Sequence, residues 1–124
     1  MHVERRAVLA GALVGFVVAA ASILLWQLCD AVFDLGDSSL VFAFYVVVLV
    51  GWIAAGYVAG RRSPDAPYSH GVLASVVSFA PIAVVGLVIA AARGDDIPAV
   101  EMTFNLLVAG SAGILGGLLA GARP

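Results

Sequence analysis

The chain has 124 residues, of which 63% are hydrophobic and only 11% are charged. A typical soluble domain carries about 25% charged residues, so a protein this small and this apolar has too few polar side chains to cover a surface in water. Six arginines, no lysine and eight acids leave a net charge of −2, which argues against a nucleic-acid-binding protein.

Four long apolar stretches follow one another along the chain, at residues 7–29, 39–60, 71–92 and 99–121. Each has about 22 residues, and a helix of that length measures roughly 33 Å, enough to cross a hydrocarbon core of about 30 Å. None shows the alternation of polar and apolar residues that barrel strands require. The sequence therefore predicts an all-α fold, an integral membrane four-helix bundle, in which residues 1–124 form a single transmembrane domain surrounded by the lipid bilayer.

A cleaved signal peptide is the alternative for the first stretch, because it begins with Arg5 and Arg6 and contains small residues near its middle. Its apolar part is longer than the 7–15 residues of a typical signal core, and three more such stretches follow. A membrane helix is therefore the favoured interpretation.

The connections between the stretches are short, which predicts that consecutive helices are antiparallel neighbours. Residues 61–70 contain Pro64 and Pro67 and are typical of a turn. Pro98 suits the first turn of the fourth helix, where a missing N–H group costs little.

The arginines predict the orientation of the chain in the membrane. Five of the six fall on one side of the predicted spans, whereas the other side carries Arg93 and six acids. We therefore expect a multi-pass protein of a bacterial-type inner membrane with both termini in the cytoplasm, oriented by Arg5, Arg6, Arg61, Arg62 and Arg123.

Glycines spaced four residues apart predict where the helices pack closely. In lipid, small residues let helix backbones approach one another, and this contact replaces the missing hydrophobic driving force. The series fall in the cytoplasmic halves of their helices, which predicts tighter packing there; a homodimer interface is the alternative to packing within the chain. The predicted packing residues are Gly11, Gly15, Gly56, Gly60, Gly113, Gly117 and Gly121.

The second and fourth stretches end alike, which suggests an internal duplication. Residues 53–62 align without gaps to residues 114–123, with an isoleucine, two glycines, an alanine and an arginine in common. The first and third stretches match more weakly. Two duplicated helical hairpins of the same orientation are the expected arrangement, although a bias towards small residues can produce such matches by chance.

Few polar residues lie at membrane depth, and none of them is ionisable, which argues against a proton-coupled pump. Pro81 interrupts the third helix near its middle, and Ser78, Asn105 and Ser111 lie in the third and fourth helices. These four are candidate pore-lining residues. The simpler interpretation is that Pro81 kinks its helix and that Asn105 finds a hydrogen-bond partner on another helix.

No catalytic, cofactor-binding or metal-binding constellation is expected. Cys29 is the only cysteine, and His70 is interpreted as a residue at the level of the lipid headgroups, because His2 is the only other histidine. Paired carboxylates at depth and a nucleophile with a nearby base are both missing. The sequence therefore predicts a protein that is not an enzyme.

The segment Gly56-Tyr57-Val58-Ala59-Gly60-Arg61-Arg62, followed by His70-Gly71, resembles a group of small, functionally uncharacterised four-span bacterial membrane proteins. In that group the second helix ends in a Gly-aromatic-x-Ala-Gly-basic pattern and a His-Gly pair opens the third. The resemblance implies a four-helix architecture and carries no known activity. Small multidrug-resistance transporters and small fluoride channels have a similar size, but their membrane glutamate and their signature patterns do not occur here.

Two hypotheses for the function follow. The favoured one is a structural or accessory subunit that packs with copies of itself or within a larger membrane complex. The alternative is a small oligomeric transporter or channel, with Ser78, Pro81, Asn105 and Ser111 near its path.

Overall fold

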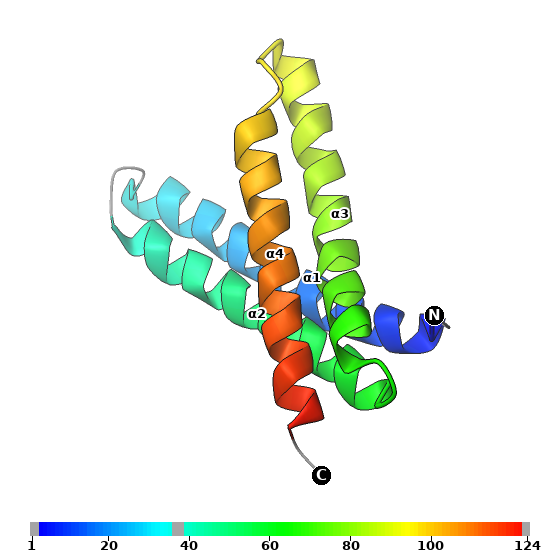
Figure 1. Ribbon diagram of the computed structural model, residues 1–124. Coiled ribbons are helices and arrows are strands. Elements are labelled where there is room, and N and C mark those ends of the chain that lie inside the picture. Colours follow the sequence, from blue (N-terminus) through cyan, green and yellow to red (C-terminus); the bar gives the residue numbers. More distant parts are fainter. Residues whose placement is uncertain (1–2, 36–38, 123–124) are drawn as a thin grey trace.

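The computed structural model describes residues 3–35 and 39–122, and this part of the chain contains no strand. It forms four α-helices: α1 (Arg5–Phe33), α2 (Leu40–Arg62), α3 (Pro67–Arg93) and α4 (Ala99–Gly121) (Figure 1). The predicted all-α helical bundle is thereby confirmed. All four helices are long and apolar enough to cross a membrane, which indicates a multi-pass membrane protein.

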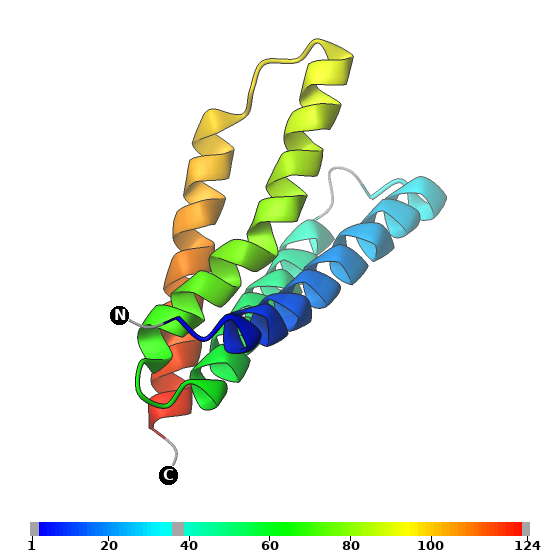
Figure 2. The same ribbon diagram turned by 90° about the vertical axis from the view of Figure 1, so that its right-hand side faces the viewer.

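The helices form two antiparallel hairpins, α1–α2 and α3–α4, which meet at one end and diverge towards the other (Figures 1 and 2). We call the end where they meet the basic end, because it carries Arg5, Arg6, Arg61 and Arg62. We call the opposite end the acidic end; it carries Asp30, Asp34, Asp95, Asp96 and Glu101, together with Arg93. Arg123, the fifth arginine used to predict the orientation, lies outside the described residues.

Buried residues are concentrated towards the basic end. In α2 they begin only at Val48, and in α4 only at Ala109. The backbones of these two helices touch there, since a Cβ atom placed on Gly56 would lie 2.8 Å from the Cα atom of Gly113. In the described residues, α2 and α4 thus pack more closely towards the basic end than towards the acidic end.

The other predicted packing glycines also lie at contacts between helices of this chain. A Cβ atom on Gly11 would lie 2.9 Å from Ala74 Cβ, and one on Gly15 would lie 2.9 Å from Ala55 Cβ. The remaining three face residues of neighbouring elements: Gly60 faces Ala120, Gly117 faces Pro67 and Tyr68, and Gly121 makes an ordinary contact with Pro67.

The contacts between helices are not those of an exact two-fold repeat. α2 lies close to both α3 and α4, and α1 lies close to α3, but in the described part of the chain no Cα atom of α1 comes within 8 Å of one in α4. A rotation that exchanged the two hairpins would turn the α2–α3 contact into an α4–α1 contact. The hairpins are therefore arranged asymmetrically.

Two helices are longer than their predicted spans. α3 begins at Pro67 rather than at residue 71, because a proline at the first helical position needs no N–H partner. The preceding turn is closed by a hydrogen bond from Ala66 N–H to Ser63 O at 3.1 Å. α1 continues to Phe33, four residues beyond the prediction, and ends where Asp34 adopts a left-handed conformation with φ of 53°. Its 29 residues measure about 43 Å, more than the bilayer core, which favours a tilted helix.

α3 changes direction about midway along its length (Figure 2). Pro81 lies within this helix, where it removes one backbone hydrogen bond and its ring displaces the carbonyl of Val77. The bend carries the second half of α3 away from α1 and α2.

Candidate functional site

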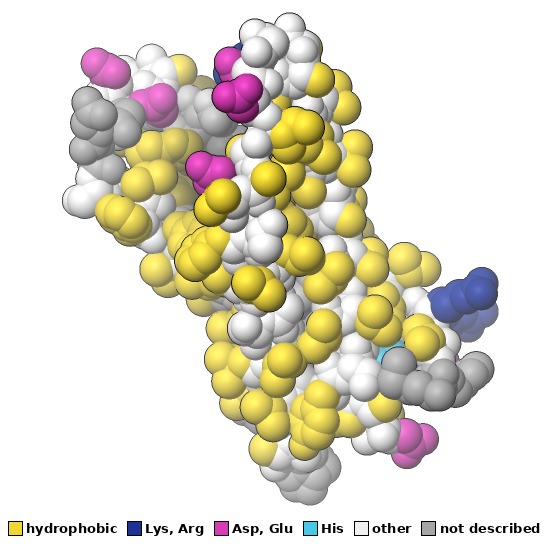
Figure 3. Space-filling view, turned by 45° about the horizontal axis from the view of Figure 1, so that its top comes forward, with side chains coloured by type: hydrophobic (Ala, Val, Ile, Leu, Met, Phe, Trp, Pro, Cys, Tyr) yellow, Lys and Arg dark blue, Asp and Glu magenta, His cyan; other side chains and the backbone are white. Residues whose placement is uncertain are grey.

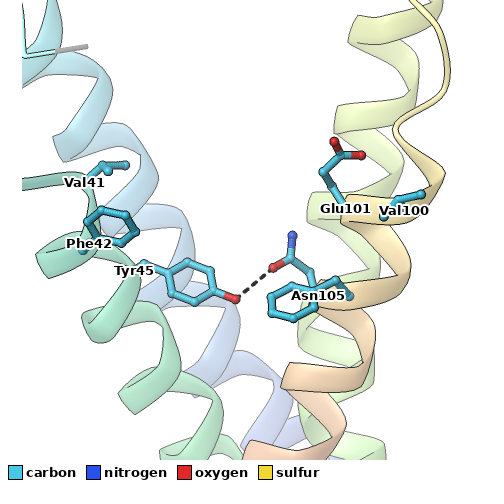
Figure 4. Close-up of a pocket in the computed structure, with 7 residues that line it drawn as sticks. Val41, Phe42, Tyr45, Val100, Glu101 and Asn105 are labelled. Carbon is cyan, nitrogen blue, oxygen red and sulfur yellow. Dashed lines mark hydrogen bonds between the residues drawn. The ribbon is translucent and has the colours of Figure 1, made fainter. Parts of the chain in front are cut away.

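An open groove of about 460 Å³ lies between α2 and α4 in the half of the molecule nearer the acidic end. Figure 4 shows side chains of both helices turned towards it. α2 contributes Val41, Phe42 and Tyr45, and α4 contributes Val100, Glu101, Phe104 and Asn105.

The spacing of these residues explains why they share one groove. On each helix they occupy neighbouring positions and positions four apart, which lie on a single face. Towards the basic end the same two helices are held together by the contact between Gly56 and Gly113. Large side chains replace glycine towards the acidic end, so the helices separate and leave a groove.

A hydrogen bond joins the two sides of the groove. The Tyr45 hydroxyl donates to Asn105 Oδ1 at 3.0 Å, and the two side chains point towards one another in Figure 4. Asn105 was predicted to find a partner on another helix, and this prediction is confirmed. The amide nitrogen of Asn105 has no partner among the described residues and turns towards the side of the groove where Glu101 lies.

Glu101 gives the groove a negative charge. It lies one helical turn before Asn105, its side chain is exposed, and no described residue forms an ion pair with it. Figure 3 shows acidic side chains on both arms at the acidic end, whereas the flanks of the helices are mainly hydrophobic. The groove thus combines aromatic rings, an amide and a carboxylate in an acidic part of the molecule.

The four candidate pore residues do not line a common path in the described structure. Ser78 is buried against Gly15, and Pro81 lies in an apolar groove between α1 and α3. Ser111 is exposed on α4, where its hydroxyl donates to the carbonyl of Leu107 at 2.8 Å. Asn105 lines the groove described above, and Ser111 lines an adjoining groove between α2 and α4 that shares Phe104 with it.

Three serine hydroxyls within the helices are satisfied by the backbone, whereas the buried Ser63 Oγ in the α2–α3 connection has no partner among the described residues. Ser75 Oγ donates to Trp52 O at 2.9 Å, and Ser78 Oγ donates to Ser75 O at 2.7 Å. Ser22 likewise donates to Val18 O at 2.8 Å. Each bond replaces water as the partner of a buried polar group, so these serines stabilise a packed interior.

The His70 side chain is buried, with 2% of its surface exposed, while its depth relative to the lipid headgroups stays a prediction. Its Nε2 accepts a hydrogen bond from the backbone N–H of Glu4 at 2.9 Å, and its Nδ1 lies 2.8 Å from the carbonyl of Ala66. A neutral ring with the proton on Nδ1 satisfies both contacts. The histidine therefore fastens the residue before α1 to the start of α3. In the sequence, the position of His70 in the His-Gly pair was the one signal of its structural role.

Comparison with known families identifies the chain. Residues 4–120 match the family described as Protein of unknown function (DUF3792). The chain belongs to the DUF3792 family. Neither the curated proteins nor the solved structures contain a match. The resemblance to an uncharacterised group with four apolar helices is thus confirmed in outline, while the glycine-aromatic and His-Gly motif proposed for that group stays a prediction.

Proposed function

We propose that this DUF3792 protein is a structural or accessory subunit, a helical unit that assembles laterally with copies of itself or with a larger membrane complex. The observation that carries the proposal is the interior at the basic end. There, helix backbones meet at Gly56 and Gly113, and the buried serines donate to backbone carbonyls. A unit built in this way is rigid and offers its apolar flanks to its surroundings.

The placement of the polar residues supports this role over transport. A pore needs polar groups or carbonyls that face a common path. In the described bundle Ser78 is buried and Pro81 lies in a groove between α1 and α3, whereas Asn105 and Ser111 line adjoining open grooves between α2 and α4. The role that we propose is therefore neither catalytic nor ion-conducting.

The orientation is part of the proposal. With the basic end in the cytoplasm of a bacterial-type inner membrane, both termini and the α2–α3 connection face inwards, as the arginine distribution favours. We also propose that the two hairpins arose by duplication, because residues 53–62 align with residues 114–123. A reporter that requires export, fused at residue 65, should be inactive; activity there would reverse the orientation.

Two experiments on the full-length protein test the proposed role. Purification from native membranes in a mild detergent should recover a stoichiometric membrane partner or a defined oligomer. Liposomes that contain the purified protein should show no flux of ions or small solutes. A flux that Asn105→Ala abolishes would overturn the proposal in favour of a channel or transporter, and a monomer without any partner would remove the assembly role.

A further inference from the structure

The groove between α2 and α4 carries chemistry that a purely structural role does not require. Phe42 and Phe104 are 70% and 60% exposed, so large parts of both side chains are not covered by the protein. Tyr45 adds a third ring and Glu101 adds a carboxylate. Aromatic faces carry partial negative charge and attract cations, and an adjacent carboxylate strengthens the same preference.

The volume and the polar lining of the groove suit a small ligand. An adjoining groove continues along the same two helices and shares Phe104 with it. Tyr45, Glu101 and Asn105 line only the part nearer the acidic end. The volume of about 460 Å³ falls within the range of about 300–1,000 Å³ that is typical of small-molecule sites.

The charge around the groove selects the kind of small ligand. Five described acids and one arginine, Arg93, surround the acidic end. A zwitterionic phospholipid would bring a phosphate close to Glu101 and to other carboxylates of this end, and like charges repel. An apolar molecule with a single positive charge meets attraction from the carboxylate and from the aromatic faces without that repulsion.

We propose that the groove between α2 and α4 binds a small amphiphilic cation, with the apolar body against Phe42 and Phe104 and the positive centre near Glu101. Asn105 is a positioning residue, because its hydrogen bond to Tyr45 sets the separation of the two walls. This site is independent of the proposed accessory role. Binding without flux is compatible with both.

The probe is tetraphenylphosphonium, compared with tetraphenylborate, which has a closely similar shape and the opposite charge. Equilibrium dialysis against the full-length protein in nanodiscs of anionic lipid measures the Kd, with empty nanodiscs subtracted. We expect saturable binding of about one phosphonium per chain and at least tenfold weaker binding of the borate. Equal binding of the two ions would overturn the proposal.

Substitutions then locate the site. Glu101→Gln keeps the shape and removes the charge, and should weaken phosphonium binding about tenfold. Phe104→Leu should weaken it about threefold to tenfold, because a cation–π contact is lost. Asp96→Asn is the matched control, since Asp96 is another exposed acid of the acidic end that does not line the groove, and should change the Kd by less than about twofold.

The other possible results of these binding measurements also test the proposed site. If Asp96→Asn weakens binding as much as Glu101→Gln, the ion responds to the general acidic field and the proposed site is wrong. If nanodiscs with phosphocholine lipids abolish the binding, a lipid occupies the groove and the proposal fails. Should Glu101→Gln prove unstable, Phe104→Leu and the phosphonium–borate comparison still test the proposal.

Discussion

The halves of this bundle nearer the basic end and the acidic end are built from the same four helices and differ in the size of the residues where they meet. Near the basic end, Gly11, Gly56 and Gly113 bring backbones into contact, and Gly15 lies against the side chains of Ala55 and Ser78. Near the acidic end, Phe42, Tyr45 and Phe104 line an open groove instead. In a membrane, where apolar surface alone does not drive helices together, residue size sets their separation. One half is therefore closed and the other is open.

The largest effect should come from adding one methyl group to the closed half. In Gly56→Ala the new Cβ would lie 2.8 Å from Gly113 Cα, and overpacking of this kind costs about 1–3 kcal/mol. The free energy of unfolding, measured by titration from a mild detergent into dodecyl sulfate, should fall by that amount.

Gly110→Ala is the matched control on α4, because a Cβ atom at Gly110 would meet nothing within 4 Å. The same methyl group there should leave the stability unchanged or raise it by a few tenths of a kcal/mol, since alanine is the better helix former. Equal losses of unfolding free energy in Gly56→Ala and Gly110→Ala would show that the close helix contact at Gly56 does not limit residue size.

The second effect should come from His70→Ala, which leaves the N–H of Glu4 without its observed partner and removes one of the two hydrogen bonds to the carbonyl of Ala66. Losing these bonds at a buried side chain should lower the free energy of unfolding by about 2 kcal/mol. Hydrogen exchange of the first turn of α1 should also rise. Unchanged exchange in that turn would show that the histidine does not hold it.

A smaller effect is expected in the open half. Tyr45→Phe keeps the ring and removes the hydroxyl that Asn105 accepts from, and hydrogen bonds between membrane helices contribute about 0.6 kcal/mol on average. A double-mutant cycle of Tyr45→Phe with Asn105→Leu should give a coupling energy of that size. A coupling of zero would mean that the bond does not hold the two walls.

The smallest effect should come from Ser111→Ala. Ser111 is exposed, and its hydroxyl is bonded only to the carbonyl of its own helix, so the change in unfolding free energy should stay below about 0.5 kcal/mol. A larger loss of unfolding free energy would show that Ser111 makes a further contact, for example with another protein.

The sequence was sufficient for the helices because lipid leaves a long apolar segment few alternatives. It also showed that Asn105 needs a partner, but not that the partner is Tyr45, because this pairing depends on how far α2 and α4 diverge. Ser22 of α1, by contrast, bonds to a carbonyl of its own helix. The sequence did not show that the His70 side chain is buried, because a histidine beside arginines resembles an interfacial residue. Its burial arises only when the segment before α1 packs over α3.

Water access to Ser78 tests most directly whether the half near the basic end is closed. Ser78 is 1% exposed, and a cysteine has nearly the same shape as the serine it replaces. In a Cys29→Ala background, Ser78→Cys should resist a charged, membrane-impermeant thiol reagent applied from either side, while Asp95→Cys should react within minutes. Rapid labelling at position 78 would reveal a water-filled path through the bundle and would contradict a packed, non-conducting interior.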